Sequence, residues 1–280
     1  MITPILIAIT GSCVLNLGFF LQKQEASQLP SFFPLRPIYF FQNLLSRKIW
    51  ILGTFCTCIG WILNFFAIAI APITIIAPFQ NVGIIFLAFL AVIFLNESFH
   101  SLELIGLGFT LFGLLCISFE SNTMIYTNNF YDGNCTFIYL SFIMIFVFIM
   151  VIGQKIWFPD KLGVLLGLVS GISAGIGSIF TKLLTIELGF SIEAGLFMGI
   201  LILCQIISFF TLQTGFQRER AMILVPIFFG FSTLIPTIGG LISFYEKISL
   251  IQWVGILLII IGTSSFFKFS NNKKFKNKIL

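Results

Sequence analysis

Apolar stretches about one membrane thickness long follow one another along this chain of 280 residues. A helix that crosses the hydrocarbon layer of roughly 30 Å needs about 20 such residues, because each adds about 1.5 Å. The uncharged run 49–96 would span about 72 Å as one helix, so it predicts two crossings with a hairpin near Ala71 and Pro72. Seven further apolar runs predict one crossing each: 2–22, 102–119, 137–153, 162–184, 194–213, 221–245 and 250–267.

The pattern predicts an all-α polytopic membrane protein with about nine transmembrane helices. Segment 22–48 leaves that number open, because it holds aromatic residues among three prolines. Proline and Arg36 are both costly inside a membrane helix, which favours an interfacial or re-entrant segment. A poorly formed tenth span is the alternative.

Composition agrees with a membrane protein. Hydrophobic residues make up 58% of the chain and charged residues 9%, against about 25% charged in a soluble domain. This excludes a soluble globule, a disordered chain and a nucleic-acid-binding module. The six cysteines lie mostly in apolar runs and predict packing rather than disulfides; only Cys135 lies in a polar loop.

The basic residues predict the orientation, because Lys and Arg gather on the cytoplasmic side. With the C-terminus inside, only Lys182 and Lys247 of the 15 basic residues fall outside. We therefore expect a multi-pass protein, in the cell membrane, with its N-terminus outside and a basic cytoplasmic tail at 268–280.

Two parts of the chain share residue spacings. The series Pro78, Glu97, Gly106, Gly113 is repeated as Pro226, Glu246, Gly255, Gly262, and the pair Gly18, Lys23 as Gly177, Lys182. This predicts a first repeat at 1–119, a linker with one helix at 120–161 and a second repeat at 162–267. The single linker helix makes the second repeat inverted. Inverted repeats are typical of alternating-access transporters, although duplication without transport is the alternative.

Polar side chains inside the spans are the candidates for a transport path, because each needs a partner in hydrocarbon. They are Asn16, Gln80, Asn81, Ser173, Ser178, Gln205, Thr233 and Thr237. Proline within a span frees a backbone carbonyl that can serve as a further ligand, and Pro78, Pro226 and Pro236 are such helix breaks. Hydrogen bonds between helices explain the same polar residues equally well.

Two other sets of residues have a structural and a functional interpretation. Glycines at intervals of four predict a smooth helix face for close packing, with a moving contact as the alternative: Gly163, Gly167, Gly171 and Gly175. Charges at span ends are candidate gates on the inner face (Lys23, Glu97) and the outer face (Lys182, Glu246). Solvation of the helix ends by snorkelling side chains is the favoured explanation of these charges.

The sequence contains few residues that are suited to catalysis. The single His100 and the aspartates Asp132 and Asp160 lie in loops, and no nucleophile, metal or phosphate-loop motif is present. We therefore expect neither an enzyme nor a cofactor. No carboxylate lies at mid-membrane, so a transported metal ion would keep its water or meet neutral oxygens.

Two stretches resemble a known group of transporters. Residues 64–97, NFFAIAIAPITIIAPFQNVGIIFLAFLAVIFLNE, and 225–246, VPIFFGFSTLIPTIGGLISFYE, are similar to helices of the drug/metabolite transporter superfamily, whose members are EamA-like. Within it, the chain resembles the NIPA-like magnesium transporters. The resemblance covers nearly the whole chain and implies a passive or potential-driven magnesium transporter.

We therefore expect transport of magnesium or a related divalent cation. The expected path runs between the first, third, sixth and eighth spans. The rival expectation is a carrier for a small neutral or amphipathic metabolite or drug, and the third is a non-transporting membrane subunit. The expected partners are the lipid bilayer, the substrate and a second copy of the chain, and no nucleic acid.

Overall fold

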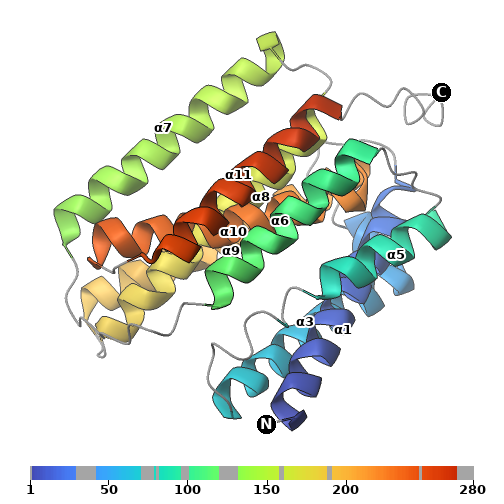
Figure 1. Ribbon diagram of the computed structural model, residues 1–280, viewed down its shortest axis with the longest axis horizontal. Coiled ribbons are helices and arrows are strands. Elements are labelled where there is room, and N and C mark those ends of the chain that lie inside the picture. The colour runs from blue at the N-terminus through green and yellow to red at the C-terminus, as the bar shows by residue number, and fades with distance from the viewer. Residues whose placement is uncertain are drawn as a thin grey trace.

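The computed structural model describes residues 2–29, 42–70, 79, 82–95, 101–119, 132–157, 161–187, 191–245 and 248–269 (Figure 1). All regular elements within these ranges are helices, which confirms the all-α fold for this part of the chain. The principal helices are α1 (Ile2–Ala26), α3 (Lys48–Ile70), α5 (Gly83–Leu95), α6 (Ser101–Phe119), α7 (Gly133–Trp157), α8 (Leu162–Ile186), α9 (Ile192–Arg218), α10 (Ala221–Ser243) and α11 (Leu250–Phe269).

Five of the described helices, α1, α7, α8, α9 and α10, are long and apolar enough to cross a membrane. Shorter apolar stretches lie in α3, α5, α6 and α11. Several helices are longer than their apolar runs: α7 begins at Gly133 rather than 137, and α9 ends at Arg218 rather than 213. The reason is that hydropathy falls at the first polar residue, whereas backbone hydrogen bonding continues until the helix is capped.

Several predictions lie outside the described residues. These are the hairpin near Ala71 and Pro72, Pro78, Gln80, Asn81, Glu97, Glu246, residues 30–41 of segment 22–48, and tail residues 270–280.

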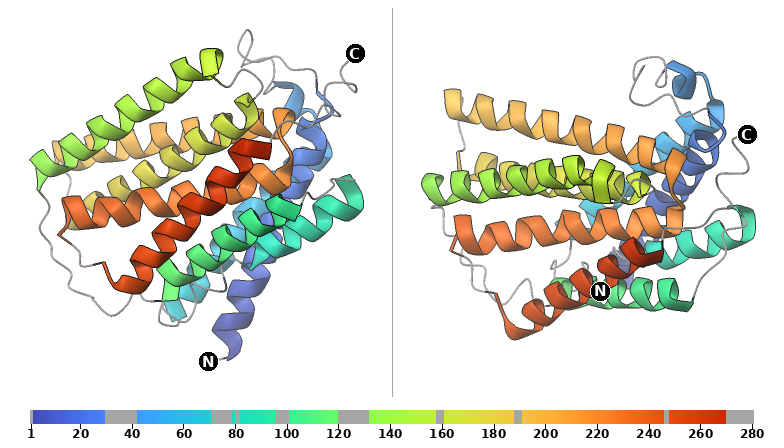
Figure 2. Two further views of the ribbon diagram at one scale, coloured as in Figure 1. Left: turned by 45° about the horizontal axis from the view of Figure 1, so that its top comes forward. Right: turned by 90° about the horizontal axis from the view of Figure 1, so that it is seen from above.

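Helix α10 lies at the centre of the bundle and contacts α1, α5, α6, α7, α8, α9 and α11, while α7 runs along the outside (Figures 1 and 2). Its closest neighbour is the glycine face of α8. A Cβ atom built on Gly171 would lie 2.6 Å from the Phe228 carbonyl oxygen, and one on Gly175 would lie 2.7 Å from Cβ of Ile235. Gly167 likewise meets Leu224, and Gly163 meets Glu219 just before α10. In the structure this glycine face of α8 lies against α10 and the residues just before it.

Helices α6 and α11 pack against each other through glycines in a reciprocal pattern. Gly113 meets the Gly255 carbonyl and Gly255 meets the Gly113 carbonyl, while Gly106 and Gly262 approach each other in the same way. The two helices are therefore antiparallel, and exchanging them reproduces both contacts.

The bundle has two ends that carry different polar contacts. At one end, which we call the Lys23 end, α1 and α9 terminate and α3, α8 and α10 begin. We call the Tyr245 end the opposite one, where α10 terminates and α7 begins, because Asp132 N donates a hydrogen bond to the Ser243 carbonyl there.

Candidate functional site

Asn16 in α1 is the predicted path residue whose surroundings are most unusual. Its side chain is fully buried, and its Nδ2 donates to the Ser12 carbonyl at 2.9 Å. Among the described residues, no group donates a hydrogen bond to its Oδ1. Ser12 Oγ in turn accepts from Gly83 N at 2.9 Å, which fixes the start of α5 beside Asn16. A buried acceptor without a donor costs about 1–3 kcal/mol, so this oxygen is suited to receive a ligand.

Asn64 is a second residue with a buried side-chain amide. It belongs to α3 and lies against a different face of α1. Its Oδ1 also has no donor within the described ranges, and a Cβ on Gly11 would lie 3.1 Å from it. It therefore packs into the contact between α1 and α3 rather than between α1 and α5.

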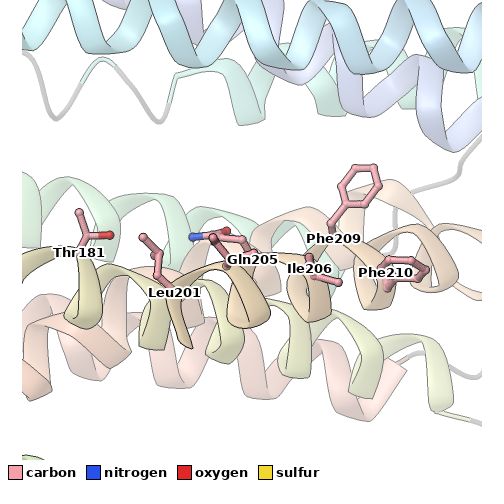
Figure 3. Close-up of a pocket in the computed structure, with 7 residues that line it drawn as sticks. Thr181, Leu201, Gln205, Ile206, Phe209 and Phe210 are labelled. Carbon is pink, nitrogen blue, oxygen red and sulfur yellow. The ribbon is translucent and has the colours of Figure 1, made fainter. Parts of the chain in front are cut away.

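Gln205 in α9 lines an open cavity of about 550 Å³ between α8 and α9. Figure 3 shows Thr181 from α8 and a row of α9 side chains along it. The lining is mostly apolar: Leu201, Ile202, Ile206, Phe209 and Phe210 accompany Thr181 and Gln205. Phe209 packs edge-on against Trp50 of α3, with ring centroids 6.1 Å apart.

Two of the remaining predicted path residues, Thr237 and Ser178, donate hydrogen bonds within their own helices. Thr237 Oγ1 donates to the Thr233 carbonyl, and Ser178 Oγ donates to the Ala174 carbonyl. Ser173 is partly buried in α8. The hydrogen bonds of these residues join none of them to Asn16 or Gln205. Pro226 and Pro236 both lie inside α10, which stays one helix despite them.

Lys23 does not snorkel to solvent, contrary to the favoured expectation. Its side chain is 1% exposed, and Nζ donates to the carbonyl oxygens of Phe216 and Glu219, both at 2.5 Å. These carbonyls belong to the C-terminal end of α9, and Lys23 itself lies in the last turn of α1. A cation is stabilised there by the negative ends of both helix dipoles. The reason for the difference is tertiary: α9 covers the end of α1.

A chain of side-chain hydrogen bonds lies beside Lys23 and joins three helices. Trp50 Nε1 donates to Gln213 Oε1 at 3.0 Å, and Gln213 Nε2 donates to Gln22 Oε1 at 2.7 Å. Gln22 Nε2 continues the chain to Thr54 and Thr57 of α3. Below it, the ring of Phe19 packs on those of Phe216, Phe228 and Phe229. The Lys23 end is therefore closed by polar and aromatic contacts.

The described contacts at the Tyr245 end are of a different kind. Lys182 is only partly buried, and its Nζ lies 4.2 Å from the ring centre of Phe244. Tyr245, with a positive φ of 53°, donates from its hydroxyl to Asp132 Oδ2 at 2.9 Å. The Cys135 backbone N–H and the Tyr245 hydroxyl each donate a hydrogen bond to the Asp132 carboxylate, and these bonds lower the pKa of Asp132. The Asp132 carboxylate in turn raises the pKa of Tyr245 to about 12.

Sequence reasoning missed the contacts that close the Lys23 end. Gln22 and Trp50 lie at the ends of apolar runs, where polar and aromatic residues are common in membrane helices and indicate no particular partner. The one available signal was Gln213, a glutamine at the end of an apolar run. A pairing between residues 22 and 213 depends on how distant helices pack and leaves no local pattern.

No group of three His, Cys, Asp or Glu side chains in the described ranges is arranged to hold a metal ion.

Comparison with known proteins identifies relatives. The family model described as "Magnesium transporter NIPA" matches residues 1–270. The mouse (Mus musculus) protein "NIPA-like protein 2" is 30% identical over 119 residues, which cover 42% of this chain and 30% of that protein. The chain thus spans less than a third of that relative's length. No solved structure matches the chain significantly.

Proposed function

The chain belongs to the magnesium transporter NIPA family, and from this premise we propose that it carries Mg²⁺ across the membrane by alternating access. Mg²⁺ dehydrates reluctantly and usually keeps several waters, so neutral oxygens that bind its water shell suit it as transient ligands.

The observation that carries this proposal is the buried Oδ1 of Asn16, an acceptor for which the described part of the chain provides no donor. Polar groups inside a membrane bundle mark substrate paths when packing alone does not satisfy them. Asn16 lies beside Gly83, which begins α5. In the sequence, Gly83 follows Gln80 and Asn81 by a few residues. In the proposed path, these amides and the carbonyls freed by proline accept hydrogen bonds from the waters of the ion.

Alternating access further needs two related halves, and several contacts support an inverted repeat. The spacings of Gly106 and Gly113 in α6 recur as Gly255 and Gly262 in α11, and these glycines pack reciprocally. A rotation that exchanges α6 and α11 would also exchange the repeats, which is the symmetry expected of inverted halves.

A carrier of small apolar or amphipathic molecules is the second candidate function. The observation that favours it is the mostly apolar lining of the cavity between α8 and α9, whose volume of about 550 Å³ is typical of small-molecule sites.

The orientation that we propose follows the charge distribution. The Lys23 end would face the cytoplasm with the C-terminal tail, and the Tyr245 end would face outside. A homodimer remains a prediction.

The test is Mg²⁺ flux into liposomes that contain the folded, purified protein, at an imposed membrane potential. Asn16→Leu is expected to lower the flux about 10-fold or more, because it removes one hydrogen bond to a charged species. Its thermal stability is expected to be unchanged or higher, because the substitution removes a buried acceptor without a donor.

Asn64→Leu is the matched control, since it removes a similar amide oxygen from the contact between α1 and α3. It is expected to leave Mg²⁺ flux unchanged. Equal flux in wild type and Asn16→Leu would remove Asn16 from the path. Folded protein in tight liposomes without any Mg²⁺ flux would instead favour the small-molecule carrier.

A further inference from the structure

We propose that Lys23 and Lys182 are reciprocal latches, each of which closes one end of the protein by binding the C-terminal carbonyls of a helix in the other half. In the present structure Lys23 holds the end of α9; in the opposite state Lys182 would hold the end of α3. The inference rests on the proposed alternating access and inverted repeat, but not on the identity of the substrate.

The first step is that the helix pair α1 and α3 is built like the pair α8 and α9. A Cβ on Gly18 would meet Gly53 and Thr57 of α3, and a Cβ on Gly177 would meet Leu201 and Gln205 of α9. Gly18 precedes Lys23 by the same five positions by which Gly177 precedes Lys182. Positions 53 and 57 therefore correspond to 201 and 205.

The second step locates the partner of Lys182. The Phe216 carbonyl accepts the hydrogen bond from Lys23. By the same correspondence between the two repeats, the counterpart of position 216 is position 68, in the last turn of α3. The contact between Lys23 and the end of α9 thus has an exact counterpart in sequence, namely Lys182 with the end of α3. Neither latch needs a carboxylate, which differs from a gate made of Lys and Glu pairs.

The third step is the asymmetry between corresponding residues. Phe19 and Gln22 are 4% and 1% exposed at the closed end, whereas their counterparts Ser178 and Thr181 are exposed. Lys182 likewise is only partly buried and lies over the Phe244 ring, while Lys23 is enclosed. Among the described residues, the positions of this pattern are therefore enclosed at the Lys23 end and exposed or partly buried at the Tyr245 end, as expected for one of two exchangeable states.

The energetics suit a latch. Burying an ammonium group is costly, and two carbonyls at a helix C-terminus offset that cost through hydrogen bonds and the helix dipole. When the end opens, water replaces the carbonyls, so the two states differ little in free energy. A small free-energy difference is what lets substrate binding shift the population.

The test compares labelling of two matched cysteines, Phe19→Cys and Ser178→Cys, each in a background without the native cysteines. A water-soluble maleimide should label Ser178→Cys faster, because this position is exposed and Phe19 is buried. Adding Lys23→Met should raise labelling at position 19 and lower it at position 178. We expect about a 10-fold change or more, the factor that loss of one charge-assisted hydrogen bond produces.

Lys182→Met is the reciprocal variant and should lower labelling at position 19 further, with position 178 still labelled fast. Opposite changes at the two positions distinguish a shift between states from loss of structure, which would raise both rates. The proposal is overturned if Lys23→Met raises both rates or changes neither, or if both lysine variants act in the same direction.

The same preparations separate this inference from the proposed substrate. Labelling needs no Mg²⁺, so opposite labelling changes in a protein without Mg²⁺ flux would support the latches and reject the ion. Mg²⁺ flux with unchanged labelling would support Mg²⁺ as the substrate and reject the latches.

Discussion

At the scale of single residues, partners decide what a polar side chain does. Asn16 and Lys23 lie in the same helix, and both are buried. Lys23 is satisfied by two carbonyls, whereas Asn16 Oδ1 accepts no hydrogen bond from any described residue. The first residue therefore suits a structural contact between helices, and the second suits a ligand. Their sequence contexts, each a polar residue in an apolar run, do not separate these roles.

The Asp132 and Tyr245 pair gives a prediction at this scale. The lowered pKa of Asp132 contributes stability that is present above the ordinary value of about 4 and is lost as pH falls through the lowered value. The raised pKa of Tyr245 contributes stability that is present below about pH 10 and is lost as pH rises through about 12. We expect the pair to stabilise the protein between these limits.

The measurement is thermal unfolding of wild type, Asp132→Asn, Tyr245→Phe and the double variant. At pH 7 each single variant should melt below wild type, and the double variant should lose less than the sum of the two. Well below pH 4 this non-additivity should disappear, because the Asp132 carboxyl is protonated. Additive losses at pH 7 would show that the hydrogen bond contributes nothing.

At the scale of elements, small residues set how closely helices approach. The contact between α6 and α11 brings the Gly113 backbone against the Gly255 carbonyl, where an added Cβ would lie 2.7 Å from that oxygen. Backbone atoms cannot move aside as a flexible side chain can. This contact, like that between α8 and α10, depends on the absence of a side chain.

Gly113→Ala is therefore expected to destabilise the protein by about 1–3 kcal/mol through overpacking. Gly108→Ala, in the same helix, meets nothing within 4 Å and should be neutral or stabilising by up to about 1 kcal/mol, because alanine favours helix formation. Melting of the two purified variants checks this difference. Equal melting temperatures would mean that α6 and α11 can separate at no cost.

At the scale of the whole molecule, the charge distribution and the fold together predict which end faces the cytoplasm. Ser27 lies at the Lys23 end and Asn134 at the Tyr245 end, and both are exposed. Their positions make a matched pair for measuring the orientation of the whole bundle.

In intact cells, a membrane-impermeant maleimide should label Asn134→Cys and leave Ser27→Cys unlabelled. Permeabilisation should make Ser27→Cys reactive. Both variants need a background without the native cysteines. Labelling of Ser27→Cys alone in intact cells would invert the proposed orientation.

The sequence by itself determined the all-α membrane class, the approximate place of the helices and the glycine face of α8. These properties follow from length, hydropathy and spacing, which are local and therefore legible along the chain. The family assignment also followed from local motifs at 64–97 and 225–246, and the family match confirmed it.

Only the tertiary structure decided which helix covers the end of α1. That choice buries Lys23 and pairs Gln22 with Gln213, while the meeting of α1 with α5 leaves Asn16 Oδ1 without a donor among the described residues. Each of these outcomes depends on atoms nearly 200 positions apart or on the meeting of α1 with α5. A hydropathy pattern records the cost of leaving a polar group in lipid, but not the neighbour that offsets it.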